Sequence, residues 1–360
     1  MRVAMYYNNH DVRVEEMPIP QIGPGELLVR VEASGICGSD VMEWDRVPKA
    51  PLVLGHEIAG VVVDVGEGEG VENSKKGEGV GSSKKGVGEF KKGDRVTAAH
   101  HVPCNTCRYC LSGHHTVCDT LRQTHFDPGG FAEFLRLPAI NVDRGVFRLP
   151  DEVSFEEACF TEPLACVLRG QGMARLEPGQ SVLVMGSGIA GLIHVQLAGR
   201  LGAARVVATD IAHYRLEAAL RFGADATIHA EEDVPARLRQ LNDGRLADLV
   251  VVCTGAPSAL AQAINSVERG GHCLFFAATE PGVTLPIPVT ELFYKNDVTL
   301  TTSYAGSPAD YATALELIRS RRVHFGGMIT HRLSLAETGL GFQLVAAAQE
   351  SMKVIIEPQR

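Results

Sequence analysis

The chain has 360 residues, of which 45% are hydrophobic and 21% are charged. This balance is typical of a globular protein with about two domains. A net charge of −9 argues against a basic surface for nucleic acid or anionic membranes. The N-terminal MRVAMYYNNHDVRVEE carries charges where a signal peptide needs an apolar run, and no apolar stretch reaches the ~18 residues of a membrane span. We therefore expect a cytoplasmic protein without nucleic-acid or membrane partners.

The first third of the chain is predicted to form a compact β domain. Its three Val-rich segments, each bounded by Gly or Pro, are LLVRVEASG (27–35), HEIAGVVVDVG (56–66) and DRVTAAHHV (94–102). Between the last two lies Gly66 to Gly93, which contains three near-copies of a heptad, VENSKKG, VGSSKKG and VGEFKKG. The repeat is too short and polar for a solenoid, so we interpret it as a lengthened, exposed hairpin loop. A lysine-rich docking loop is the alternative, although its glutamates offset most of the charge.

Four cysteines, Cys104, Cys107, Cys110 and Cys118, are spaced C-x2-C-x2-C-x7-C in CNTCRYCLSGHHTVC. Thiolates this close together are typical of a zinc site, and four cysteine ligands leave no open coordination position. The site would therefore be structural and would organise a loop that lacks its own core. A disulfide cluster or buried small side chains are the alternatives, and a chain without a secretory signal disfavours disulfides.

From Ser181 the pattern changes to alternating strands and helices. The expected strands are 181–186, 205–210, 226–230, 248–253 and 272–277, and the expected helices are 189–202, 213–223, 234–241 and 257–267. Strands joined by helical crossovers predict a doubly wound parallel sheet. The last stretch, with strand 298–304, helix 309–320 and strand 352–358, could close that sheet and then return to the first domain.

A G-x-G-x-x-G motif, Gly186, Gly188 and Gly191, follows the first of these strands and opens a helix through Ile189 and Ala190. The glycines permit a tight turn, close approach of a pyrophosphate and close helix–strand packing, while the helix N-terminus attracts phosphate. This context favours a dinucleotide site.

The second strand ends at Asp210, where a carboxylate can bind the ribose hydroxyls and repel a 2′-phosphate. NAD is therefore favoured over NADP. Arg215 is a possible acceptor of a 2′-phosphate, and Asp210 could instead cap the next helix.

A second candidate metal site is dispersed along the chain, with Cys37 in GICGSD, His56 and Glu57 in GHE, and Glu162 in TEPLAC. Cysteine, histidine and carboxylate ligands are typical of catalytic zinc, which keeps a position open for an alcohol oxygen. Taken singly, Cys37 could be a core residue, His56 a buried histidine and Glu162 a helix cap.

The chain resembles the zinc-dependent medium-chain dehydrogenase/reductase family, and within it the sorbitol (polyol) and threonine dehydrogenase branch. The matching segments, in order, are GICGSD (35–40), GHEIAGVVVDVG (55–66), KKGDRV (91–96), CNTCRYCLSGHHTVC (104–118), EPLAC (162–166), VMGSGIAG (184–191) and ATD (208–210). The resemblance implies an α/β fold: a GroES-like, β-rich catalytic domain over 1–150 and 297–360, around a Rossmann NAD-binding domain over 151–296.

The resemblance also implies roles for single residues. Cys37 and His56 would bind the catalytic zinc directly, while Glu57 and Glu162 would exchange direct and water-mediated positions. Asp40 would hydrogen-bond the far nitrogen of His56, and Ser39 would contact the alcohol oxygen and start the proton relay.

The implied reaction is oxidation of a secondary alcohol, with two zinc ions per chain and hydride transfer to NAD. One departure concerns the relay, because Met42 stands where relatives have a histidine. The proton would leave through water and the cofactor ribose, or through Glu43. The polyol is the main substrate class, and threonine or another hydroxy-acid derivative is the alternative. A catalytically silent protein that binds nucleotide and metal is the third hypothesis, and the family implies a homodimer or homotetramer.

Overall fold

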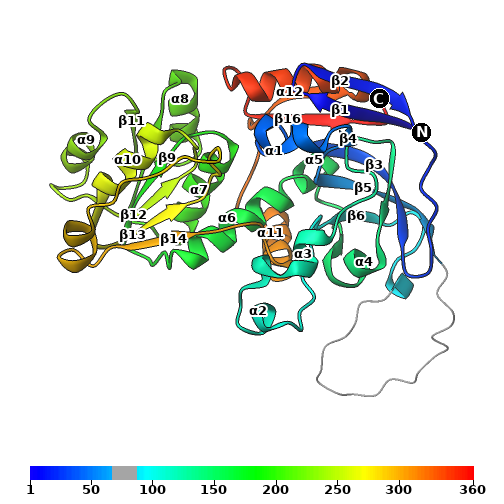
Figure 1. Ribbon diagram of the computed structural model, residues 1–360, viewed down its shortest axis with the longest axis horizontal. Coiled ribbons are helices and arrows are strands. Elements are labelled where there is room, and N and C mark those ends of the chain that lie inside the picture. The colour runs from blue at the N-terminus through cyan, green and yellow to red at the C-terminus, as the bar shows by residue number, and fades with distance from the viewer. Residues whose placement is uncertain (67–86) are drawn as a thin grey trace. The chain divides into compact units, whose positions relative to one another are not determined.

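The computed structural model describes residues 1–66 and 87–360, which form two compact units (Figure 1). Unit 1 comprises Met1–Glu162 and Ser307–Arg360, and unit 2 comprises Pro163–Gly306. The unit boundaries lie later in the chain than the expected 150 and 296. Helix α5 (Phe155–Ala158), which begins with a Ser154–Glu157 capping box, contacts β3 and β5 of unit 1, and β14 (Thr299–Thr302) pairs within unit 2. Most of the loop predicted for 66–93 lies outside the described residues.

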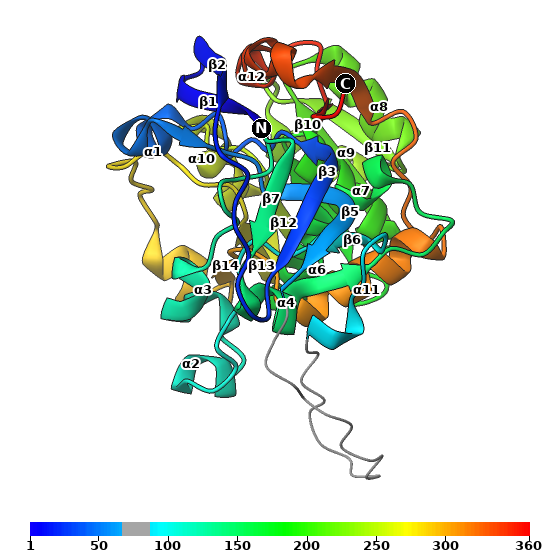
Figure 2. The ribbon, with the colours of Figure 1, turned by 90° about the vertical axis from the view of Figure 1, so that its right-hand side faces the viewer.

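Unit 1 is built on two sheets. The larger runs β15-β16-β3-β5-β6-β8 with β7 beside β3, and the smaller runs β2-β1-β4. The strands are β1 (Arg2–Asn8), β2 (Asp11–Glu16), β3 (Leu27–Gly35), β4 (Leu52–Val53), β5 (Glu57–Val65), β6 (Arg95–Ala98), β7 (Phe134–Leu137), β8 (Val146–Arg148), β15 (Ile329–Ser334) and β16 (Lys353–Glu357). Figure 2 shows β3, β5, β6 and β7 side by side. The β1–β2 hairpin was not predicted from the sequence, since no strand was expected before residue 27.

The helices of unit 1 are short apart from the last two, which have 12 and 10 residues. They are α1 (Glu43–Arg46), α2 (Arg108–Leu111), α3 (Asp119–Gln123), α4 (Ala139–Gly145), α5, α11 (Pro308–Arg319) and α12 (Thr338–Ala347), with 3-10 turns at Val47–Lys49, Val87–Glu89, His115–Val117 and Leu335–Glu337. Alternation in β3 points Leu27, Val29 and Val31 into a core shared with β5 and β6. β16 lies between β15 and β3 in the larger sheet, so the last strand of the chain belongs to unit 1.

Unit 2 contains a six-stranded sheet in which all neighbouring strands are parallel, in the order β11-β10-β9-β12-β13-β14. The remaining strands are β9 (Ser181–Met185), β10 (Arg205–Asp210), β11 (Ala226–His229), β12 (Ala247–Val252) and β13 (Val267–Phe275). This is the strand order of the dinucleotide-binding doubly wound fold. The α/β prediction for this half of the chain is confirmed, and 298–304 joins this sheet as expected.

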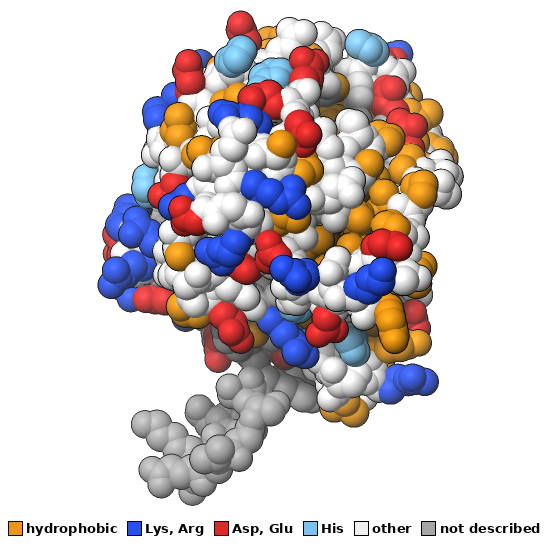
Figure 3. All heavy atoms as spheres, turned by 90° about the vertical axis from the view of Figure 1, so that its left-hand side faces the viewer, with side chains coloured by type: hydrophobic (Ala, Val, Ile, Leu, Met, Phe, Trp, Pro, Cys, Tyr) orange, Lys and Arg blue, Asp and Glu red, His pale blue; other side chains and the backbone are white. Residues whose placement is uncertain are grey.

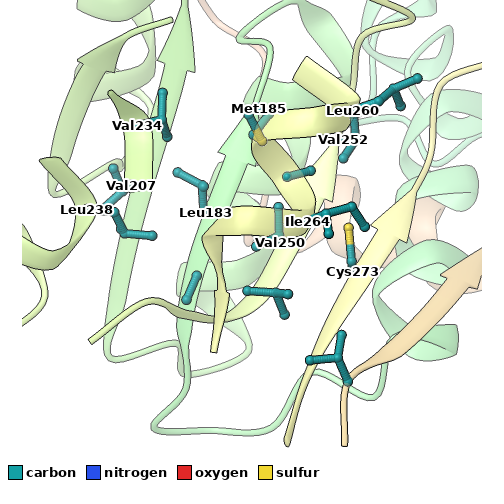
Figure 4. Close-up of a cluster of buried hydrophobic side chains, with 14 of the residues drawn as sticks. Leu183, Met185, Val207, Val234, Leu238, Val250, Val252, Leu260, Ile264 and Cys273 are labelled. Atoms are coloured by element: carbon teal, nitrogen blue, oxygen red, sulfur yellow. The ribbon is translucent and has the colours of Figure 1, made fainter. Parts of the chain in front are cut away.

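Four helices connect consecutive parallel strands of unit 2: α7 (Ile189–Arg200), α8 (His213–Arg221), α9 (Val234–Leu241) and α10 (Pro257–Ser266). Helix α6 (Thr161–Met173) starts at the unit boundary and precedes β9, and a π-helical turn spans Thr290–Tyr294. Figure 4 shows Val234 and Leu238 of α9 and Leu260 and Ile264 of α10 meeting side chains from the sheet. Burial of these four side chains holds α9 and α10 against the sheet, because apolar area removed from water stabilises the packed state.

Charged side chains of both signs are interspersed over the face drawn in Figure 3, as the acidic but mixed composition predicts. Over residues 1–66 and 87–360, the structure contains no helix long and apolar enough to cross a membrane.

Candidate active site

Three side chains predicted to bind a catalytic metal come together in unit 1. Cys37 follows β3, His56 precedes β5, and Glu57 is the first residue of β5. One ligand atom from each lies within 4.8 Å of the others. Gly55 sets the approach to His56, because its φ of 97° is a left-handed conformation that glycine adopts without strain. A β-carbon there would also lie 2.9 Å from the Phe131 nitrogen.

Asp40 lies next to His56, on the side of its Nδ1 atom. Its Oδ1 is 3.4 Å from His56 Nδ1, and its Oδ2 accepts the Cys37 N–H at 3.0 Å. Burial opposes ionisation of Asp40, but the facing His56 and the Cys37 N–H hold its pKa below the usual value. A carboxylate in this position orients the imidazole and leaves the other ring nitrogen for a metal.

Glu57 has a partner that the sequence analysis missed. Lys353 of β16 is fully buried, and its Nζ forms an ion pair with Glu57 Oε2 and donates to the Ile36 carbonyl at 3.1 Å. Burial alone would lower the pKa of Lys353, but Glu57 and Cys37 outweigh it and raise that pKa. Gly35 makes room for the pair, since a β-carbon there would collide with both side chains. The feature of the sequence that could have predicted a buried pair is the lysine at the start of the apolar run KVII.

The donor set fits a divalent metal. Glu57 Oε1 is buried and accepts no hydrogen bond from any residue that the structure describes, while Oε2 is taken by Lys353. A buried acceptor without a donor is costly unless a cation or water reaches it. A thiolate, an imidazole and a carboxylate are ligands that zinc accepts.

The remaining predicted residues of this site lie as follows. Ser39 is in the turn after Cys37, and its N–H lies 3.5 Å from Cys37 Sγ. Glu162 is in the first turn of α6, the last residue of unit 1, and is not part of the group that Cys37 forms. Glu43 starts α1, and its Oε1 accepts the Asn9 N–H at 2.9 Å. Met42 is half-buried at the N-cap of α1.

The four cysteines of the 104–118 segment form a second metal-like cluster. Their sulfur atoms lie within 4.8 Å of one another, with separations of 3.9 Å for Cys104–Cys110 and 3.6 Å for both Cys107–Cys110 and Cys104–Cys118. Four thiolates at 2.3 Å from a tetrahedral zinc would be about 3.8 Å apart. The cluster therefore fits a closed, structural zinc site.

Backbone donors favour the thiolate form in this cluster. The N–H groups of Thr106 and Cys107 point at Cys104 Sγ at 3.4 and 3.2 Å, and the Cys104 N–H points at Cys118 Sγ at 3.4 Å. Hydrogen bonds from Thr106 and Cys107 lower the pKa of Cys104 to about 5. Burial raises the pKa of Cys110 to about 12, so this sulfur needs a metal more than Cys104 does to lose its proton.

Cys107→Ser should remove one metal ion per chain and loosen the 104–118 lobe. A structural metal supplies folding free energy to a segment with little core of its own, and here the buried apolar partner of the cysteines is Leu121. Metal analysis together with hydrogen exchange of the lobe measures both effects. Cys273→Ala, a buried cysteine of unit 2, is the matched control and should leave both unchanged. Unchanged metal content in Cys107→Ser would contradict a structural zinc.

The glycine-rich turn of unit 2 has the form that a dinucleotide requires. Gly186 has a φ of 94°, and a β-carbon on Gly191 would collide with the Gly186 carbonyl, so helix and strand approach closely. At Gly188 a β-carbon would meet only Arg215 Nη1, at 3.8 Å, which leaves space beside the backbone. Gly188 is the N-cap of α7, and no described side chain caps the helix. The first N–H groups, starting at Ile189 and Ala190, therefore remain available to a phosphate.

Asp210 is held at the end of β10 by two backbone donors. Its Oδ2 accepts the Ser187 N–H at 2.8 Å, and its Oδ1 accepts the Ala212 N–H at 2.9 Å. Helix α8 starts at His213 with Ala212 as its N-cap, so Asp210 is not the cap of that helix. Ser187, which the sequence analysis did not single out, couples the glycine turn to this carboxylate. Arg215 Nε donates to the Tyr214 hydroxyl at 2.8 Å.

A hollow of about 480 Å³ lies in unit 2 at the carboxyl ends of β13 and β14, and its lining includes Phe276, Ala277, Thr302 and Ser303. In a parallel sheet the carboxyl ends of all strands share one edge, so the hollow and the glycine turn lie on the same edge. The sequence analysis did not predict it, because no motif distinguishes these residues.

Known proteins resemble this chain over nearly its whole length. The family model "Alcohol dehydrogenase GroES-like domain" matches residues 23–151, and "Zinc-binding dehydrogenase" matches residues 190–320. Sorbitol dehydrogenase of Gallus gallus is 32% identical over 96% of this chain and 93% of its own. L-threonine 3-dehydrogenase of Bacillus velezensis is 31% identical over 98% of this chain and 96% of its own.

A solved structure agrees with these relatives. The alcohol dehydrogenase from Thermus sp. ATN1 is 30% identical and superimposes with a TM-score of 0.82 over 99% of both chains. The matched domains follow the same order as the two-part unit 1 and the parallel-sheet unit 2. The predicted architecture, a GroES-like domain combined with a Rossmann domain, is thus confirmed. The chain belongs to the zinc-dependent medium-chain alcohol dehydrogenase family of oxidoreductases.

Proposed function

We propose that this chain is an NAD-dependent zinc dehydrogenase that oxidises a secondary alcohol of the polyol class. The observation that carries the proposal is the convergence of Cys37, His56 and Glu57, with Glu57 Oε1 left without a donor in the described chain. Relatives named sorbitol dehydrogenase and D-xylulose reductase support the polyol class, since both names refer to sugar alcohols or their ketoses.

Cys37, His56 and Glu57 would hold the zinc, and Glu162 would approach it during turnover. When bound, zinc acts as a Lewis acid and lowers the pKa of an alcohol. Asp40 orients His56 through the 3.4 Å contact, and Lys353 holds one oxygen of Glu57 away from the ligand position. Ser39 would take the proton of the alcohol. Because Glu43 already accepts the Asn9 N–H, we favour a relay through water and the cofactor ribose over one through Glu43.

The dinucleotide would bind along the carboxyl edge of the unit 2 sheet. Its pyrophosphate would meet the N-terminus of α7 at Gly188, its ribose would meet Asp210, and its nicotinamide end would enter the hollow beside Phe276 and Thr302. Two backbone N–H groups hold the Asp210 carboxylate in place at the end of β10, which supports a preference for NAD over NADP.

Replacing Asp210 with glycine together with Ile211→Arg should lower the ratio of kcat/KM for NAD to that for NADP by roughly 100-fold. The change removes the charge that repels a 2′-phosphate and adds a cation at a neighbouring position that is 70% exposed. Ile211→Ala alone is the matched control and should keep the ratio of the wild type. An unchanged ratio in the double variant would remove Asp210 from the cofactor site.

We further propose two zinc ions per chain, one at Cys37 and one at the four cysteines. The partners would be a small alcohol substrate and a second or further copies of the chain, as a homodimer or homotetramer. The cytoplasmic location and the lack of nucleic-acid or membrane partners, expected from composition, stay predictions.

The substrate class is tested by initial rates of NADH formation over a panel of polyols, simple secondary alcohols and L-threonine. We expect the highest kcat/KM for a polyol. Highest efficiency for L-threonine would instead favour the alternative that the Bacillus velezensis relative represents. Absence of turnover with every secondary alcohol and with both cofactors would contradict the proposal and favour a silent nucleotide-binding protein.

A further inference from the structure

Three histidines of unit 1 gather in a cluster that the proposed reaction does not use. His100 and His101 follow β6, and His125 follows α3. One ring nitrogen from each lies within 4.8 Å of the others. The three rings lie against one another, with centroids 4.4 Å apart for His100–His101, 5.2 Å for His100–His125 and 5.4 Å for His101–His125. From these contacts we infer that His100, His101 and His125 form a further binding site for a divalent transition-metal ion.

The spacing of the nitrogen atoms in the cluster fits a metal ion. His100 Nδ1 and His101 Nε2 are 3.3 Å apart. Two imidazole nitrogens on a tetrahedral zinc, each at 2.0–2.1 Å, would be about 3.4 Å apart. His125 is exposed, so a side-chain rotation can bring its nitrogen to a third vertex. Three histidines would leave a fourth position for water or another small ligand.

Contacts with neighbouring residues hold two of the rings in place. His101 Nδ1 lies 2.8 Å from the Thr124 carbonyl, which can only accept, so Nδ1 carries the proton and Nε2 presents its lone pair. Thr124 Oγ1 also accepts the Val102 N–H at 2.9 Å, which ties the two histidine-bearing segments together. Asn141 Nδ2 donates to the His100 carbonyl at 3.0 Å, and the edge of Phe126 meets the His100 ring.

Two cations near the cluster oppose a metal ion, but both are paired. Lys49 Nζ lies 2.7 Å and Arg46 Nη1 3.2 Å from Asp45, which offsets much of their charge. No carboxylate belongs to the cluster, so it should select zinc, copper or nickel, which favour imidazole, over magnesium, which favours oxygen. The His100 ring lies 5.9 Å from the ring of His56, so an ion here would adjoin the proposed catalytic site.

The test is equilibrium dialysis of the purified holoenzyme against buffered Zn²⁺, with metal analysis of the protein at each free concentration. The wild type should take up one Zn²⁺ per chain beyond its resident metal. His125→Ala should weaken that uptake at least about tenfold without unfolding the chain, because His125 is exposed. His101→Gln, checked by thermal unfolding, should do the same, whereas His10→Ala, an exposed histidine outside the cluster, should bind as the wild type does.

Three outcomes would overturn the inference: no further ion in the wild type, equal uptake in the wild type and both cluster variants, or equal loss in His10→Ala. Uptake of Mg²⁺ to the same extent as Zn²⁺ would also contradict a histidine site. The cluster variants keep the two other candidate metal sites, so the difference in uptake between them and the wild type reports the histidine cluster alone. The result does not depend on turnover.

Discussion

Cys37→Ala is expected to lower kcat by about 1,000-fold or more, equivalent to about 4 kcal/mol of transition-state stabilisation. Cys37 supplies the thiolate of the group formed with His56 and Glu57. Two ligand residues would remain, which is fewer than the three protein ligands of typical catalytic zinc sites. Steady-state rates of NADH formation measure the loss.

The same variant should keep its fold and its affinity for the dinucleotide. Cys37 belongs to unit 1, whereas the glycine turn and Asp210 belong to unit 2. Equilibrium binding of NADH and the thermal midpoint check both points. Cys273→Ala, which removes a buried thiol of the unit 2 core, is the matched control and should keep kcat within about threefold of the wild type. Full activity in Cys37→Ala would refute a catalytic metal at this cysteine.

Lys353→Met should destabilise unit 1 by about 3–5 kcal/mol. The substitution leaves the Glu57 carboxylate buried without its cation, and an uncompensated buried charge is costly. Lys353 also donates to the Ile36 carbonyl, which would lose that donor. Hydrogen exchange of peptides from β3, β5 and β16 reports the local loss, because Glu57 begins β5, Lys353 begins β16 and Ile36 directly follows β3.

Two comparisons make this prediction specific. Glu57→Gln combined with Lys353→Met should recover much of the lost protection, since neither charge is then left alone. Lys49→Met removes an exposed ion pair with Asp45, in which the lysine side chain is 56% exposed, and should cost less than about 1 kcal/mol. If Lys353→Met were as mild as Lys49→Met, the buried pair would have no structural importance.

Much of unit 2 could be predicted from the sequence, because its signals are local. β9 consists of five buried residues, the last four of which are apolar, and Gly186 directly follows it, so strand, turn and helix can be placed within one or two residues. The parallel order follows from helical crossovers of one hand. The cysteine cluster was equally local, since all four ligands lie between 104 and 118.

What the sequence could not supply depends on contacts between distant residues. Lys353 meets Glu57 only because β16 pairs with β3, and nothing in KVIIE specifies that neighbour. His125 lies near His100 because Thr124 Oγ1 accepts the Val102 N–H and so joins the segments before and after the four cysteines. The unit boundaries also depend on packing between elements. Helix α5 belongs to unit 1 because it contacts β3 and β5, and β14 belongs to unit 2 because it pairs with β13.

The central claim, that activity depends on a metal held by Cys37, His56 and Glu57, is tested most directly by graded chelation. Samples treated with a zinc chelator for increasing times would be assayed for metal content and for the rate of NADH formation. We predict that activity falls in proportion to the loss of one zinc per chain, while the zinc of the four-cysteine cluster is retained, and that added Zn²⁺ restores the rate. An undiminished rate after that zinc has been removed would contradict the account.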